Sequence, residues 1–480
     1  RVGFVSAHFR WHSVGRLTIG LLERLCTRRG LEVFVIDASS DGGHRSTAGQ
    51  PTATTAQDTS RGEPDEDFTA REAIATLQLD VLVYADVGMD AFTTGLAHGR
   101  LSPVQVAFWG HPGTTGLSTM DYFISSDLFE GELGAGWGDR KLRSDDGGAS
   151  SVDDDTRHVG HREEAGRNPD VRDEATAVGG DEPVAWSGAE RRDRQHAFSE
   201  QLVRLGGLGF IFDDPAQTFG LPSSCGGDGR AASSPEVVEN REAEEANRPR
   251  LYVCAQSLMK MHPAFDAAVA GILAADPLAQ ILLLRDSRQL LWHSRFRRRL
   301  RAAVNAAEQS AVSTFGATAQ NGTGPASSPI RGGLWSRVRF VSPLSGREFF
   351  RLQCRADVVL DPFPFGGGVT TLEALACGTP VVTAGALQSV HRLAEGLIAA
   401  VANTQCQGRE DLVARSTTEY IAKAVAVAAP GALKRKVRRA LRCGRNGLLH
   451  GGGGGGGGGG EDGSDVAADW ERFLTNAAAL

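Results

Sequence analysis

Short apolar runs alternate with amphipathic segments over two long stretches of the chain, residues 1–130 and 250–447. Strands are predicted wherever β-branched and aliphatic residues cluster, at Val2–Ser6, Leu31–Ile36, Val81–Tyr84, Val104–Trp109, Leu251–Cys254, Ile281–Arg285, Val338–Val341, Val358–Leu360 and Val381–Val382. Helices are predicted where apolar residues recur every three or four positions, at Leu17–Leu25, Ala70–Leu77, Ala264–Ala274, Arg347–Cys354 and Leu372–Ala376. Short apolar strands that alternate with helices are typical of parallel sheets, so we predict an α/β protein with two facing Rossmann-like lobes.

Polar segments interrupt this pattern and carry almost no periodic apolar residues. We predict disordered inserts at 131–196, 223–249 and 317–329, and a glycine-rich linker at 448–464 that contains ten consecutive glycines. Residues 197–222 are expected to return to the N-terminal lobe, and 465–480 to form a terminal helix over Val466–Leu474. Much of the excess of glycine, 60 of 480 residues, therefore lies outside the folded lobes.

The charge balance limits the partners that we expect. With 51 basic and 58 acidic residues, the net charge is −7, which argues against nucleic acid or a membrane surface as a main partner. No apolar run is long enough to span a bilayer. The chain begins at Arg1 without an initiator methionine or a leader, so we expect a fragment or a trimmed product.

The seven cysteines are scattered and include no C-x-x-C pair. We therefore expect neither a disulfide framework nor a zinc site, and a cytoplasmic or nuclear location.

A glycine-rich loop between a predicted strand and a helix is the most informative local feature. Gly366, Gly367 and Gly368 allow close approach of a ligand to the backbone, and the helix that follows would present free amides to an anion such as a diphosphate. Glu373, one turn later, could bind ribose hydroxyls. An alternative is that Thr370 and Glu373 form a capping box and serve only the helix.

Four segments together resemble the catalytic region of protein O-linked N-acetylglucosamine transferases. They are Arg1–His12, Ala107–Gly116, Tyr252–Pro263 and Ala356–Thr383. The resemblance covers most of both ordered stretches and none of the inserts. It implies a GT-B fold and an inverting transfer from a UDP-sugar donor.

The resemblance assigns residues to the donor site. Lys260 matches the lysine that neutralises the donor diphosphate, and His12 matches an active-site histidine whose proton role is left open; solvated or packing roles are the alternatives. The loop against the donor sugar corresponds to Gly110, His111 and Pro112. The nucleotide and diphosphate site corresponds to Ser257, Gly367, Gly368, Val369, Thr370, Thr371 and Glu373.

The sequence also departs from the family pattern at several positions. Ser257 stands where animal members have a glutamine, with Gln256 beside it, so the polar contact could shift by one residue. Near the uracil, animal members have a lysine and a histidine, whereas this chain offers Arg347 and Phe349. Gly368 replaces a histidine of the phosphate loop.

The resemblance thus implies transfer of N-acetylglucosamine to Ser or Thr of proteins. No cofactor or metal is expected, because Lys260 and a helix N-terminus supply the positive charge that a divalent ion supplies elsewhere. Family members normally carry tetratricopeptide repeats upstream, and none occurs in this chain. The alternatives are a hexosyltransferase that uses UDP-glucose and a catalytically silent UDP-binding scaffold.

Overall fold

The computed structural model describes most of both ordered stretches. The described residues are 1–9, 12–39, 66–111, 113–130, 197–221, 245, 247–285, 289–318, 333–385, 389–402, 411–449 and 465–479. All of them belong to one compact unit made of 1–131 and 185–480. The predicted insert 131–196 lies outside the described residues, as do Pro112 and most of the other inserts and the linker.

The first sheet contains six parallel strands in the order β2-β1-β3-β4-β5-β6. Its strands are β1 (Val2–Ser6), β2 (Val33–Asp37), β3 (Val81–Tyr84), β4 (Val104–Phe108), β5 (Tyr122–Ser126) and β6 (Gln201–Leu205). Strands β1, β3 and β4 are buried along their whole length, which explains why they read as unbroken apolar runs. The accompanying helices are α1 (Ser13–Leu25), α2 (Glu66–Thr76), α3 (Ala91–Ala97), α4 (Asp127–Glu130) and α5 (Pro215–Thr218).

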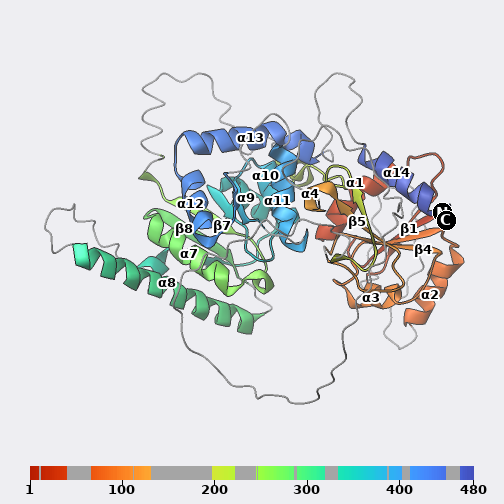
Figure 1. The fold of residues 1–480 in the computed structure, drawn as a ribbon, viewed down its shortest axis with the longest axis horizontal. Coiled ribbons are helices and arrows are strands. Elements are labelled where there is room, and N and C mark those ends of the chain that lie inside the picture. The colour runs from red at the N-terminus through yellow and green to blue at the C-terminus, as the bar shows by residue number, and fades with distance from the viewer. Residues whose placement is uncertain are drawn as a thin grey trace, which may run out of the picture. The chain divides into compact units, whose positions relative to one another are not determined.

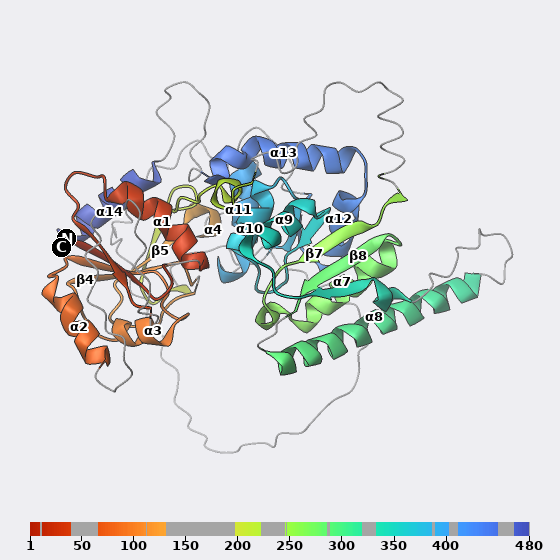
Figure 2. The same cartoon turned by 180° about the vertical axis from the view of Figure 1, so that it is seen from behind.

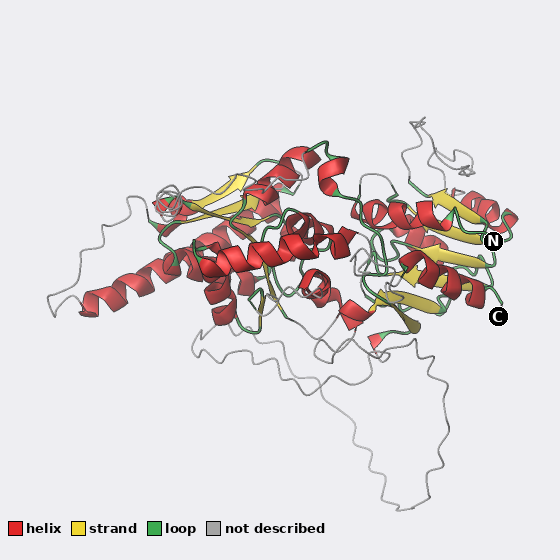
Figure 3. Ribbon diagram, turned by 90° about the horizontal axis from the view of Figure 1, so that it is seen from above, coloured by secondary structure: helices red, strands yellow, loops and turns green. Residues whose placement is uncertain are grey.

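The second sheet also has six parallel strands, in the order β12-β11-β10-β7-β8-β9. They are β7 (Arg250–Cys254), β8 (Ala279–Leu284), β9 (Val338–Val341), β10 (Val358–Leu360), β11 (Val381–Ala384) and β12 (Val413–Ala414). Its helices are η2 (Leu258–Lys260), α7 (Pro263–Ala275), α8 (Leu290–Thr318), η4 (Leu334–Arg337), α9 (Gly346–Arg355), α10 (Val369–Ala376), α11 (Ser389–Ala402), α12 (Thr417–Ala428) and α13 (Ala432–Leu449). Figure 3 shows the strands in yellow with the helices in red around them.

Helices cover both faces of the first sheet. Helices α1 and α14 (Val466–Ala477) lie on one face, and α2 and α3 lie on the other (Figures 1 and 2). Trp470 of α14 is fully buried; its ring packs on Phe4 and Phe108, and its Nε1 donates to the carbonyl of Gly209 at 2.9 Å. The last helix of the sequence therefore completes the core that the first strand begins.

The α/β expectation is confirmed, and the predicted strands lie within two residues of the observed ones. Two helices extend into segments predicted to be unstructured: α8 continues to Thr318, two residues into the predicted insert, and α13 continues to Leu449, two residues into the predicted linker. Within the described ranges, every helix is too short or too polar to cross a lipid bilayer. The proposed domain boundaries stay predictions.

Candidate nucleotide-sugar site

The glycine loop joins β10 to α10 at the carboxyl end of the second sheet, where ligands of α/β proteins usually bind. A side chain at Gly366 would collide with the carboxylate of Asp361, and one at Gly367 would collide with the amide of Gln256 and the hydroxyl of Thr370. At Gly368, by contrast, the nearest atom to an added Cβ is 3.8 Å away. The first two glycines are thus required by local packing and the third is not.

Lys260 lies against this loop, because β7 is the neighbour of β10 and η2 follows β7. Its ammonium donates to the carbonyl of Gly366 at 2.7 Å and to Oε1 of Gln256 at 3.2 Å, and it lies over the ring of Phe365. Burial lowers the pKa of Lys260, and the nearby Asp361 carboxylate opposes that effect. A partly buried ammonium with neutral oxygen partners is well suited to receive an anion.

The sequence analysis left open whether Ser257 or its neighbour Gln256 makes a polar contact near Lys260, and the structure shows a contact from Gln256. Its side-chain amide donates to Oγ1 of Thr370 while its oxygen accepts from Lys260, so it joins the lysine to the start of α10. Ser257 is exposed and makes no side-chain hydrogen bond as the N-cap of η2. Lys260 therefore contacts Gln256, the neighbour that the sequence analysis named beside Ser257, and the assignment of Ser257 to the nucleotide stays a prediction.

The N-terminus of α10 has the form expected of an anion site. Gly368 is the N-cap and offers no side chain, and Val369 begins the helix. Oγ1 of Thr371 donates to the carbonyl of Gly367 at 3.2 Å. Because the N-cap is Gly368, the alternative of a capping box between Thr370 and Glu373 is wrong, and the first helical amides are left for another acceptor.

Glu373 is almost fully buried and has two protein partners. Nη1 of Arg16, on α1, donates to one carboxylate oxygen at 2.6 Å, and Nε2 of Gln353 donates to the other at 2.9 Å. Burial raises the pKa of Glu373, and the Arg16 charge opposes this. Its assignment to the ribose stays a prediction, since both oxygens already accept hydrogen bonds from the protein.

His12 is the N-cap of α1. Its Nδ1 accepts from the amide of Val14 at 3.3 Å, and its ring stacks on His8 with 4.2 Å between centroids. Burial and then the neighbouring His8 lower the pKa of His12. With Nδ1 accepting, the neutral ring carries its proton on Nε2, so Nε2 can donate a hydrogen bond.

The loop that holds His8 depends on Asp86, a fully buried residue just beyond β3 that the sequence analysis did not single out. Its Oδ2 accepts from Oγ of Ser6 at 2.8 Å and from the amide of Ala7 at 2.9 Å. The sequence feature that could have pointed to Asp86 is an acidic residue that follows the apolar run of β3.

The remaining candidates are the residues assigned to the donor sugar and to the uracil. A side chain at Gly110 would collide with the carbonyl of Ala85, so close backbone packing requires this glycine, and His111 packs near Gly88. Arg347 is exposed, with Nη2 3.5 Å from the carbonyl of Gly220. Phe349 is partly buried on α9, and its contact with uracil stays a prediction.

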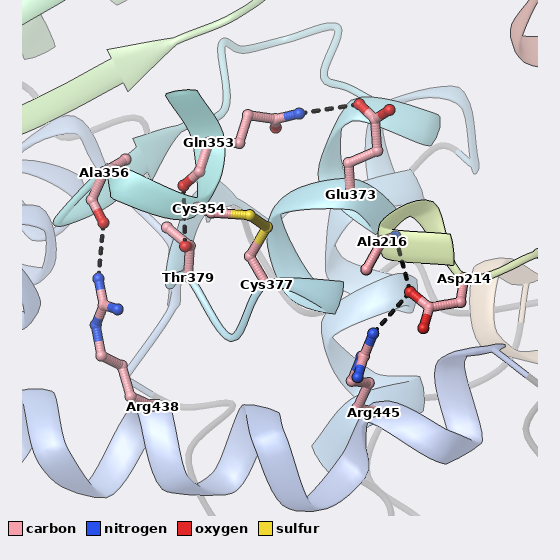
Figure 4. The surroundings of a disulfide bond; sticks show 10 residues. All are labelled: Asp214, Ala216, Gln353, Cys354, Ala356, Glu373, Cys377, Thr379, Arg438 and Arg445. Carbon is pink, nitrogen blue, oxygen red and sulfur yellow. Dashed lines mark hydrogen bonds and ion pairs between the residues drawn. A yellow bond between two sulfur atoms is a disulfide. The ribbon is translucent and has the colours of Figure 1, made fainter. Parts of the chain in front are cut away.

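A disulfide between Cys354 and Cys377 corrects the expectation drawn from cysteine spacing. Cys354 lies near the end of α9 and Cys377 is the C-cap of α10, with 5.0 Å between their Cα atoms (Figure 4). The packing of α9 against α10 brings together two residues that are 23 positions apart. A pair that meets only through tertiary packing leaves no motif in the sequence.

No known family profile matches the chain. A segment of 86 residues is 36% identical to the SPINDLY protein of Solanum lycopersicum, named as a probable UDP-N-acetylglucosamine–peptide N-acetylglucosaminyltransferase. The SPINDLY protein of Petunia hybrida is 35% identical over 86 residues. Each match covers 18% of this chain and 9% of the plant protein.

Among solved structures, a mutant of the Thermobaculum terrenum O-GlcNAc transferase superposes with a TM-score of 0.58 and 20% identity, over all of this chain and 68% of that one. The superposition and the two parallel sheets show that the chain has the fold of the GT-B class. Within that class, it has an O-GlcNAc-transferase-like catalytic region.

Proposed function

We propose that this protein transfers N-acetylglucosamine from UDP-N-acetylglucosamine to serine or threonine hydroxyls of proteins. The observation that carries the proposal is the convergence of Lys260 and Gln256 on the glycine loop that opens α10. The names of the plant relatives support this sugar and this acceptor. The protein acceptors and any upstream tetratricopeptide repeats belong to the same proposal.

The proposed reaction is a single displacement at the anomeric carbon. The acceptor hydroxyl oxygen forms a bond to that carbon as the bond to the UDP oxygen breaks, and the hydroxyl proton passes to a base. Negative charge then develops on the departing diphosphate. Lys260 and the free amides at Val369 and Thr370 would stabilise that charge, which is the largest contribution that fixed groups usually make to such a step.

We propose further that this transfer requires no metal, because an ammonium and a helix N-terminus already provide positive charge at the loop. Transfer should therefore persist when a chelator such as EDTA is present. Loss of transfer on chelation, restored by a divalent cation, would contradict this part of the proposal.

The decisive variant is Lys260→Ala, measured by calorimetric titration with UDP and by transfer from UDP-N-acetylglucosamine. Loss of a charge-assisted contact predicts about 10- to 100-fold weaker UDP binding. The matched control is Lys436→Ala in α13, because Lys436 is exposed and pairs only with Asp411 at 3.2 Å among the contacts described. That variant should bind UDP like the parent protein.

Three results would reject or redirect the proposal. Absence of binding at millimolar UDP rules out the enzyme, binding without transfer indicates a silent scaffold, and faster transfer from UDP-glucose indicates a hexosyltransferase. Full activity of Lys260→Ala would contradict the mechanism.

A further inference from the structure

A buried carboxylate lies inside the glycine loop. Asp361 follows β10 directly and is 2% exposed. Its Oδ1 accepts from the amide of Gly367 at 2.6 Å, and its Oδ2 accepts from Oγ1 of Thr383, on β11, at 2.7 Å. Gly366 packs so closely on the carboxylate that it has no room for a side chain. The loop is therefore folded around Asp361.

The backbone of Asp361 is fixed as firmly as its side chain. Its amide donates to the carbonyl of Val382 at 3.0 Å, and its carbonyl accepts from the hydroxyl of Tyr420, on α12, at 2.9 Å. The carboxylate thus connects a rigid strand end to the loop, and it has little freedom to move on its own.

A negative charge beside an expected diphosphate site repels the ligand, so the presence of Asp361 there calls for an explanation. Burial raises the pKa of Asp361 to about 6, and the hydrogen bonds from Gly367 and Thr383 and the charge of Lys260 oppose that rise. In return, the Asp361 charge is the main influence that opposes the lowering of the Lys260 pKa by burial. The two groups therefore stabilise each other's charged forms.

The other titratable groups that interact with this pair are Cys254 at the end of β7 and Tyr420 of α12. Burial raises the pKa of both groups above its ordinary value. Both consequently stay neutral between pH 6 and pH 9, and neither explains a change in UDP binding in that range.

We propose that Asp361 is a positioning residue of the diphosphate site, which shapes the glycine loop through Gly367 and balances the charge of Lys260 without touching the donor. This inference rests on the proposed UDP-sugar function. It assigns a task to a side chain that is buried behind the loop, out of reach of a bound donor.

Asp361→Asn separates the charge from the hydrogen bonds. The amide oxygen of asparagine can still accept from Gly367, and its NH₂ group can donate to the Thr383 hydroxyl, which accepts as well as donates. Without the negative charge, the pKa of Lys260 falls, so the ammonium loses its proton at a lower pH. UDP binding should therefore weaken at a lower pH in the variant than in the parent protein.

The experiment is calorimetric titration of the full chain with UDP from pH 6 to pH 9. At pH 6, where about half of the parent Asp361 carboxyl is already protonated, the two proteins should agree within about threefold. At pH 9, Asp361→Asn should bind UDP about tenfold more weakly, because more of its Lys260 has lost the proton that makes the charge-assisted contact. In a Lys260→Ala background, Asp361→Asn should no longer weaken binding at pH 9.

Thr383→Val tests the same carboxylate without changing its charge. It should bind UDP about two- to tenfold more weakly because one hydrogen bond is lost. The pH above which UDP binding weakens should be the same as in the parent protein. This variant decides the question if Asp361→Asn fails to fold.

Superimposable pH profiles of Asp361→Asn and the parent protein, or unchanged UDP affinity of Thr383→Val, would overturn the inference and leave the proposed function standing. If the parent protein does not bind UDP at any pH, the proposed function itself has failed.

Discussion

The three consecutive glycines of the loop differ in what an added methyl group would meet. At Gly367, it would meet the Gln256 amide and the Thr370 hydroxyl, the two groups that join Lys260 to α10. At Gly368, it would meet only the distant Leu393 side chain. This contrast provides a matched pair of substitutions one residue apart.

Gly367→Ala should weaken UDP binding at least about tenfold and destabilise the protein by about 1–3 kcal/mol, because the extra methyl forces its neighbours apart. Gly368→Ala should leave UDP binding nearly unchanged, because the added methyl meets no atom closer than 3.8 Å, and it should cost about 0.5–1 kcal/mol of stability because alanine is a poorer N-cap than glycine. Titration with UDP and urea denaturation measure both effects. Equal behaviour of the two variants would contradict this account of the loop.

Individual residues also mark the limit of what the sequence could predict. Local pattern was enough to find the glycine loop, because a strand, a loop and a helix are contiguous there, whereas Lys260 was assigned from the family resemblance. It could not choose between Ser257 and Gln256, since neighbours in an irregular turn point in different directions. Nor could it identify Arg16, which contacts Glu373 from a position 357 residues earlier in the chain.

At the scale of elements, α9 and α10 act as one unit. The disulfide joins their C-terminal ends, Gln353 of α9 donates to Glu373 of α10, and the hydroxyl of Thr379 donates to the carbonyl of Gln353 at 3.0 Å (Figure 4). The helix whose N-terminus faces the proposed diphosphate site is thereby anchored at its opposite end.

Cys354→Ser should lower the free energy of unfolding by about 3 kcal/mol under oxidising conditions, as expected for a cross-link between residues 23 positions apart. Dithiothreitol should produce the same loss in the parent protein and none in the variant. Cys443→Ser, at an exposed free cysteine, is the control and should have no effect. Parent-like stability of Cys354→Ser in oxidising buffer would argue against the disulfide.

Nine strands were predictable because aliphatic and β-branched residues cluster in them, whereas β5, β6 and β12 were not predicted, and β6 carries Gln201 and Arg204 among its apolar residues. The residues at which the elements begin and end were harder to predict. The apolar spacing alone placed the start of α10 at Leu372, whereas the helix begins at Val369, directly after the glycine loop, as the pattern of a loop followed by a helix indicates. The disulfide was missed for the related reason that pairing depends on helix packing.

At the scale of the whole molecule, α14 unites the two ends of the chain. Besides the burial of Trp470 among aromatic rings, Arg28 just beyond α1 forms an ion pair with Asp465, the N-cap of α14. The first sheet is therefore covered by a helix more than 400 residues from its first strand.

Trp470→Ala should destabilise the protein by about 3–5 kcal/mol, the usual loss when a large buried aromatic side chain is truncated. Trp292→Ala makes the same substitution at a tryptophan that is 46% exposed, and it should cost far less. Urea denaturation compares the two. A similar loss for both variants would contradict the role assigned to α14.

The position of α14 has a consequence for synthesis on the ribosome. Strand β1 and its neighbours emerge first, and α1 soon covers part of one face of their sheet, yet the part that α14 covers stays exposed until Trp470 has left the exit tunnel. The second sheet is translated in between and does not depend on that helix for its core. The lobe that is made first should thus be the last to mature, and its uncovered aromatic face is where a chaperone would have to act during translation.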